Sequence, residues 1–143
     1  MIATDRRRGY RSAMRRHGLD EHIRVIHGDS TEQAGERAGR HLLGSGDLPT
    51  AVVAFNDQSA IGLLTAFRRA GVDVRGTVSV AGYDDTLSRL DAFDLTTVSQ
   101  NAEEQARQAV AAAVDRLDGG RTESREIALA PSSVVRGTTA GPR

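Results

Sequence analysis

Cysteine, tryptophan and lysine are all absent from this sequence of 143 residues. Without cysteine the chain can form no disulfide, no thiolate nucleophile and no zinc–thiolate site. Aromatic residues make up only 3% of the chain, so its core must be built from valine, isoleucine, leucine and alanine. The length suffices for one compact domain with a real core.

Net charge and long apolar runs are also missing. The formal charge is zero, which gives no electrostatic case for a nucleic-acid-binding surface on this chain. The N-terminus has no apolar run of signal-peptide length, and no segment approaches the roughly 20 apolar residues of a membrane-spanning helix. We therefore expect a cytoplasmic protein that has no membrane partner.

Helix-like and strand-like patterns alternate along the first part of the chain. The run Ala51–Phe55 is apolar throughout, which is typical of a strand covered on both faces. Helix, strand, helix, strand, helix, strand is the order of βαβ units, so the pattern predicts an α/β fold with a parallel sheet flanked by helices. The predicted helices cover 5–17, 31–43 and 57–71, and the predicted strands cover 23–26, 51–55 and 78–81.

The pattern changes after Asp85. A short strand is predicted at 95–98, followed by a strongly amphipathic helix at 102–117. Extended pieces are expected at 126–129 and 133–135, and a disordered tail at 137–143. This second part is predicted to add a C-terminal helix and short strands to the parallel sheet.

Polar side chains follow each of the three predicted strands. Ligands of open parallel sheets bind beyond the carboxyl ends of the strands. Amides donate and accept, and carboxylates accept from two directions, which suits the adjacent hydroxyls of a sugar or the ring nitrogens of a base. We assign binding roles to Asn56 and Asp84, interpret Asp57 as a helix cap, and assign Asp85 a turn or capping role.

Catalytic and metal chemistry have little support in the residues. Asp84 and Asp85 are adjacent, so on an extended segment they would point apart, which is poor geometry for a paired acid and base. No serine lies in a nucleophile-elbow pattern, and the four histidines lack metal-ligand spacing. We therefore expect no enzyme activity, no catalytic residues, no metal and no cofactor.

Seven short motifs follow one another along nearly the whole chain. They are Asp5-Arg6-x-x-Gly9-Tyr10, Gly28-Asp29, Pro49-Thr50-Ala51-Val52-x-x-x-Asn56-Asp57, Ile61-Gly62, Ser79-Val80-x-Gly82-Tyr83-Asp84-Asp85, Leu95-Thr96-Thr97-Val98-x-Gln100 and Val135-Arg136-x-Thr138-Thr139. Each motif is weak alone. The series as a whole resembles the C-terminal part of a lactose-repressor (LacI-type) transcription regulator.

The resemblance implies an effector-binding domain related to periplasmic binding proteins, with the ligand in a cleft between two subdomains. Such regulators are homodimers that bind DNA through an N-terminal helix-turn-helix. By position, Asp84 matches the acidic residue that grips the effector, and Asn56 matches a pocket residue of sugar-responsive members. Thr4 and Arg6 fall in a segment that supplies pocket groups. Ser30 stands where several members place an aromatic ring, so ring stacking from that position is lost.

The resemblance also divides the chain. Residues 1–136 correspond to an effector-binding fragment: a C-terminal subdomain (1–95), the crossover and helix (96–120) and the return strands (121–136). The helix-turn-helix, the hinge and most of the N-terminal subdomain have no counterpart here, so we expect half a pocket and no specific DNA binding. The helix at 102–117 lacks the sheet that it covers in the family. We expect it to pack in a partner chain, to fold back elsewhere or to be poorly ordered.

Four functions follow from these observations. The first is the effector-binding portion of a LacI-type regulator. For this function we expect a small-molecule effector, a sugar, and a homodimer. The second is a sugar-binding protein of the periplasmic type, a component of transport. The others are an enzyme on the same scaffold and a short dimerisation partner of intact regulators.

Overall fold

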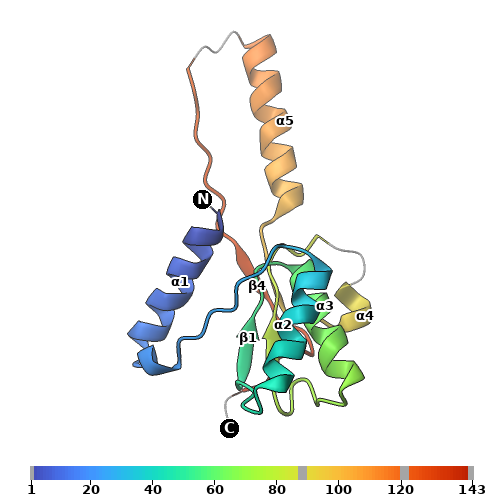
Figure 1. Cartoon of the computed structure of the whole chain (residues 1–143). Helices are drawn as coiled ribbons and strands as arrows, with labels where there is room; N and C mark the ends of the chain where they lie inside the picture. The colour runs from blue at the N-terminus through green and yellow to red at the C-terminus, as the bar shows by residue number, and fades with distance from the viewer. Residues whose placement is uncertain (1, 87–89, 120–122, 142–143) are drawn as a thin grey trace.

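The structure, a computed structural model, describes residues 2–86, 90–119 and 123–141. A body of sheet and helices carries one long helix that projects away from it (Figure 1). The elements in chain order are α1 (Ile2–Arg16), a 3-10 turn η1 (Asp20–His22), α2 (Glu32–Gly44), β1 (Ala51–Val53), α3 (Asp57–Arg69), β2 (Ser79–Ala81), α4 (Leu90–Phe93), β3 (Thr97–Ser99), α5 (Ala102–Asp118) and β4 (Ser132–Val134).

The sheet is parallel where the predicted βαβ units are found. Strands β1 and β2 pair in parallel with Val52 opposite Val80. Two parallel bridges, Ala81 to Thr96 and Asp84 to Ser99, attach the segment of β3 to the end of β2. Strand β4 runs antiparallel to β3. The α/β fold with a parallel sheet is confirmed, and the carboxyl ends of β1, β2 and β3 lie at one edge.

The core lies between this sheet and α3. Phe67, Ile61 and Leu95 are fully buried together with Val78 and Val80. Helix α2 lies against α3 so closely that a Cβ at Gly35 or Gly62 would strike a backbone carbonyl of the facing helix. Backbone atoms cannot move aside as the end of a side chain can, so only glycine fits there.

Both body helices begin with side-chain caps. Thr31 accepts a hydrogen bond from the Ala34 amide at 3.2 Å at the start of α2. At the start of α3, Asn56 Oδ1 accepts from the Ser59 amide at 2.9 Å. The sequence prediction that Asp57 caps this helix is therefore wrong by one residue, because Asn56 has the extended backbone of a cap.

Two predicted strands are not strands. Residues 23–26 are extended but have no ladder partner, and the Arg24 amide donates to the Tyr10 hydroxyl at 3.4 Å instead. Residues 126–129 likewise form no ladder. A strand exists only through hydrogen bonds to a neighbour, which a local pattern does not specify. The first helix also begins earlier than predicted, at Ile2.

The expected disorder of the tail is wrong for residues 137–141. Thr138 is 4% exposed, and its hydroxyl donates to the Val80 carbonyl at 2.7 Å. The Val80 amide donates back to the Thr138 carbonyl at 2.8 Å. The segment is thus fixed along β2, and only residues 142 and 143 of the predicted tail lie outside the described residues.

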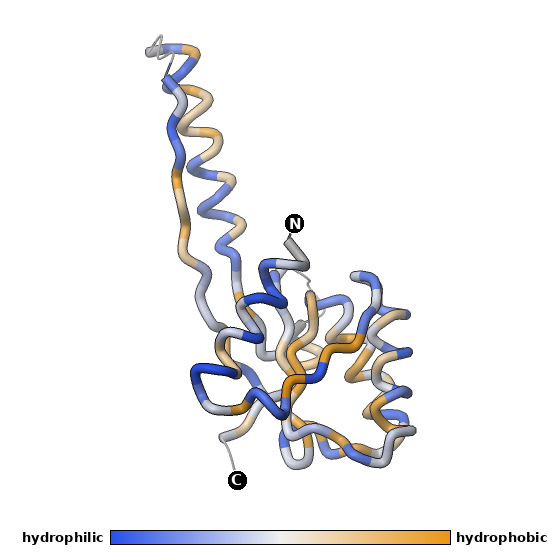
Figure 2. Tube along the Cα trace, turned by 60° about the vertical axis from the view of Figure 1, so that its left-hand side comes forward, coloured by the Kyte–Doolittle hydropathy of each residue, from blue (hydrophilic) through white to orange (hydrophobic). Residues whose placement is uncertain are grey.

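Helix α5 forms an arm with the segment that returns beside it, residues 123–131 (Figures 1 and 2). None of its residues is buried, and Val110, Val114 and Leu117 are 64%, 47% and 83% exposed. The helix is therefore not covered within the described chain, and the structure does not show it folded back onto the body. No described helix is long and apolar enough to cross a membrane.

Candidate functional site

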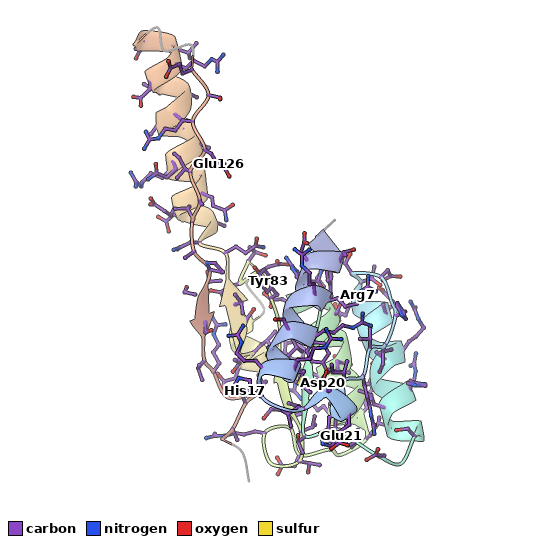
Figure 3. All side chains as sticks on the ribbon, turned by 90° about the vertical axis from the view of Figure 1, so that its left-hand side faces the viewer. Arg7, His17, Asp20, Glu21, Tyr83 and Glu126 are labelled. Carbon is purple, nitrogen blue, oxygen red and sulfur yellow. The ribbon has the colours of Figure 1, made fainter. Side chains whose placement is uncertain are left out.

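The guanidinium of Arg6 lies at the edge where the strands end. Its Nη2 is 3.2 Å from Asp84 Oδ1, and its Nη1 donates to the Phe55 carbonyl. The Arg6 Cζ stands 3.7 Å from the centroid of the Tyr83 ring and 4.7 Å from that of Phe55. Tyr83 is visible in Figure 3 beside α1, at the base of the arm. Two aromatic faces and one carboxylate thus hold the cation in a fixed plane.

Asp84 is reached from two further directions. Gln100 Nε2 donates to Asp84 Oδ1 at 2.7 Å, and the backbone amide of Asp84 donates to the Val98 carbonyl at 2.9 Å. Within the described residues, Oδ2 of Asp84 has no hydrogen-bond partner. The side chain is 26% exposed, so it is partly accessible to a ligand while Arg6 and Gln100 hold its Oδ1.

Asp57 contacts the backbone turn formed by Asp84 and Asp85. It is 1% exposed, and its two oxygens accept from different segments: Oδ1 from the Thr97 hydroxyl at 2.6 Å and Oδ2 from the Asp85 amide at 2.7 Å. Burial raises the pKa of Asp57 above its ordinary 3.8, and the charges of Asp84 and Asp85 act in the same direction. Asp57 is thus a structural carboxylate, not a surface one.

Asp85 is held by an arginine from the C-terminal segment. Arg136 Nη2 is 2.9 Å from Asp85 Oδ1, and its Nη1 donates to the Leu95 carbonyl at 2.8 Å. The interpretation of Asp85 as a turn residue agrees with its φ of 56°, and Asp84 before it has a φ of 121°. Two successive positive φ angles at residues other than glycine are strained, so the surroundings must hold them in place.

Asn56 and Ser30 are brought together, but through a backbone atom. Asn56 Nδ2 donates to the Ser30 carbonyl at 3.0 Å, while its Oδ1 caps α3. Thr4 lies elsewhere: it lines a hollow along the arginine-rich face of α1 with Arg7 and Arg11, and not the Arg6–Asp84 site. Of the five predicted site residues, Arg6 and Asp84 are in direct contact, Asn56 and Ser30 form a second pair, and Thr4 stands apart.

Sequence reasoning missed several members of the site. Phe55 and Tyr83 were available as the aromatic residues next to Asn56 and Asp84, and Gln100 as the end of a strand motif. Their contacts with Arg6 and Asp84 join residues up to 77 positions apart, from Arg6 to Tyr83, which no local pattern reveals. The described residues contain no cluster of three or more histidine, aspartate or glutamate side chains able to hold a metal ion.

Residues 2–139 match a family model described as a periplasmic binding protein-like domain. The chain belongs to this family. Among members of the periplasmic binding protein-like family, it is similar to the transcriptional regulator GalR of Escherichia coli, with 34% identity over 98% of this chain and 41% of the relative. It is 35% identical to the regulator DegA of Bacillus subtilis, over 94% and 40% of the two chains.

Solved structures give the same picture. A LacI transcriptional regulator from a Rhodococcus species superposes with a TM-score of 0.84 and 42% identity, covering 95% of this chain and 50% of that one. A dimeric Lac repressor gives 0.83 and 29%, covering 99% and 52%. A LacI-family regulator from Enterococcus faecium with bound ribose gives 0.83 and 25%, covering 94% and 50%.

These comparisons confirm the resemblance to the C-terminal region of LacI-type regulators. The relatives are transcription regulators and not enzymes, as the sequence predicts. The chain spans about two fifths of the length of the curated relatives that it matches.

Proposed function

We propose that this chain is the effector-binding portion of a LacI-type transcription regulator and that its effector is a sugar. The observation that carries the proposal is the Arg6–Asp84 pair at the carboxyl edge of the sheet, in which the Arg6 guanidinium lies over the rings of Tyr83 and Phe55. Ligands of open α/β sheets bind at this edge. The proposal is supported by the bound ribose of the Enterococcus relative.

The chemistry of the pair suits neighbouring hydroxyls. One hydroxyl donates to Asp84 Oδ2, and the next accepts from an N–H of Arg6, so a vicinal diol is gripped by one acceptor and one donor. The half-exposed rings of Tyr83 and Phe55 offer apolar faces for the C–H side of a sugar. We propose that the opposite wall of the effector cleft comes from outside this chain.

A regulatory role brings further partners. We propose a homodimer, because a similar solved structure is a dimeric Lac repressor. Operator DNA would be bound through a helix-turn-helix outside these 143 residues, and the whole regulator would work in the cytoplasm. A sugar-binding transport component is less well supported, because the curated relatives are transcription regulators.

The test is calorimetric titration of the 143-residue chain with D-ribose and a panel of other monosaccharides. Asp84→Asn keeps the size of the side chain but removes the charged acceptor, and should weaken binding about tenfold to a hundredfold, as expected for a hydrogen bond to a charged group. Asp118→Asn, at the far end of α5, is the matched control and should bind like the parent.

Equal affinity of parent and Asp84→Asn would contradict the assignment of the anchor. Absence of binding to every sugar of the panel would contradict the proposal that the residues of this half of the site recognise a sugar by themselves. Chemical conversion of the sugar during the titration, detected by chromatography, would favour the enzyme instead.

A further inference from the structure

Asp57 is a buried carboxylate that the proposed effector contacts do not use. It lies in the first turn of α3, one residue after Asn56, and is 1% exposed. A buried carboxylate is expensive unless hydrogen bonds satisfy it, and here each oxygen has one donor. A simple helix-capping role does not explain it, because Asn56 already caps α3.

The carboxylate joins three segments that meet at the effector site. Its backbone belongs to α3, its Oδ1 accepts from Thr97 on β3, and its Oδ2 accepts from the Asp85 amide. The Asp57 amide also donates to the Tyr83 carbonyl at 2.9 Å. A Cβ at Gly82 would strike Asp57 Oδ1, so the loop is shaped around this side chain.

The turn that Asp57 contacts needs such support. Asp84 and Asp85 have φ angles of 121° and 56°, which residues with a Cβ rarely adopt, so the turn persists only if its surroundings hold it. The Asp85 amide is fixed by Asp57, and the Asp85 side chain by Arg136. The direction of the Asp84 side chain depends on this backbone conformation.

We propose that Asp57 is a positioning residue that holds the Asp84–Asp85 turn and thereby sets the affinity for the effector. The inference rests on the proposed function, because it takes Asp84 as the effector anchor. The charged groups that face Asp57 are Asp84 and Asp85, and Arg136 stands behind Asp85. Asp57 acts on the ligand only through the turn.

Two substitutions at position 57 separate positioning from bulk stability. Asp57→Ala removes both acceptors and frees the Asp85 amide. Asp57→Asn keeps an amide oxygen for the Asp85 N–H and offers its NH₂ group to the Thr97 hydroxyl, which can accept. We expect Asp57→Ala to weaken binding of the monosaccharide by tenfold or more, and Asp57→Asn to stay within about threefold of the parent.

Thr97 gives a second pair if Asp57→Ala does not fold. Thr97→Val keeps the shape but removes the hydroxyl donor to Asp57, whereas Thr97→Ser keeps the donor. We expect weaker binding for Thr97→Val, by about threefold to tenfold, and parent-like binding for Thr97→Ser. Hydrogen exchange of the Asp85 amide, followed by NMR, reports the turn without any ligand and should be faster in Asp57→Ala and Thr97→Val only.

The outcomes separate this inference from the proposed function. If Asp84→Asn binds like the parent, the effector anchor is wrong and the inference falls with it. If Asp84→Asn weakens binding but a folded Asp57→Ala does not, only the positioning role is wrong. An Asp85 amide that exchanges equally slowly in parent and Asp57→Ala also overturns the role, whether or not any sugar binds.

Discussion

Helices α3 and α5 are both amphipathic, yet they end in opposite environments. Helix α3 buries nine of its thirteen residues, and α5 buries none of its seventeen. The difference lies in what faces them: α2 and the sheet cover α3, while only the returning segment 123–131 runs beside α5. An apolar stripe thus shows which face of a helix needs a partner, and the partner decides whether that face is buried.

The two helices also differ in what stabilises them. Helix α3 contributes Phe67, Ile61 and Leu64 to the core, where each fully buried side chain stabilises the fold by roughly 1.5–3 kcal/mol. Helix α5 relies on surface pairs such as Arg107 with Glu104, at 2.6 Å. Pairs of this kind on a solvated helix surface contribute little to stability. The body is therefore expected to hold nearly all of the stability.

The largest expected effect is a cavity in the body. Phe67→Ala should lower the free energy of unfolding by about 3–5 kcal/mol, because the ring is fully buried. Leu117→Ala on the 83% exposed tip of α5 should stay within about 0.5 kcal/mol. Urea unfolding followed by circular dichroism measures both. Similar losses for the two variants would show that α5 has a buried partner in solution.

The next effect concerns the contact between α2 and α3. Gly62→Ala should destabilise the protein by about 1–3 kcal/mol, because the new methyl group meets the Glu32 carbonyl. In α1, a Cβ at Gly9 meets no atom within 4 Å, so Gly9→Ala should stabilise by about 0.5–1 kcal/mol. Thermal unfolding of both variants gives the signs. A stabilising Gly62→Ala would contradict the close helix contact.

A smaller effect is expected from the cap of α2. Thr31→Ala removes the acceptor for the Ala34 amide and should cost about 1 kcal/mol. Thr4→Ala replaces an exposed residue inside α1 and should be neutral or slightly stabilising. Chemical denaturation compares the two threonines directly. Equal losses would mean that helix starts matter as much in α1 as in the body.

The smallest effects are opposite pH dependences in the two regions. Because burial raises the pKa of Asp57, the folded state binds the proton more tightly, so Asp57 makes unfolding easier as pH rises from 3.8 through its raised pKa. Hydrogen bonds from Arg107 and Gln108 lower the pKa of Glu104 to about 2, so its contribution is present above 4.5 and is lost as pH falls towards 2.

Asp57→Asn and Arg107→Gln isolate these two dependences. The pH profile of the melting temperature should lose its decline with rising pH in Asp57→Asn, and its acid-side loss should shrink in Arg107→Gln. Because Glu104 is exposed, 1 M NaCl should also shrink its contribution, while that of Asp57 should persist. A profile unchanged in Asp57→Asn would contradict a raised pKa.

Local patterns predicted the parts of the fold that local forces decide. The apolar run Ala51–Phe55 correctly predicts a strand, but β1 ends at Val53 and Val53 is 66% exposed, so the expected cover on both faces is wrong. Strand-end logic brings Asn56 and Asp84 to one edge. Segment 23–26 has the composition of a strand but no neighbouring strand. Thr138 shows the reverse, since its order comes from Val80, 58 residues away. Such pairings depend on tertiary structure.

The same distinction between local patterns and tertiary contacts holds for the site. Asp84 follows from its place after a strand, and Arg6 was proposed only through the family resemblance. The direct contact between them, across 78 positions, was not predicted. Asp57 was placed correctly on a helix start and given the wrong role. The cap lies one residue earlier, so the carboxylate is free to turn inward towards Thr97.

The close contact between α2 and α3 at Gly35 and Gly62 sets the distance between the two loops that precede these helices. Helix α2 begins just after Ser30, and α3 begins just after Asn56. The distance between the two helices therefore determines the distance between Ser30 and Asn56. Side chains at positions 35 and 62 would push the two helices apart and increase that distance. Gly35 and Gly62 thus fix the distance between the loop that ends at Ser30 and the loop that ends at Asn56.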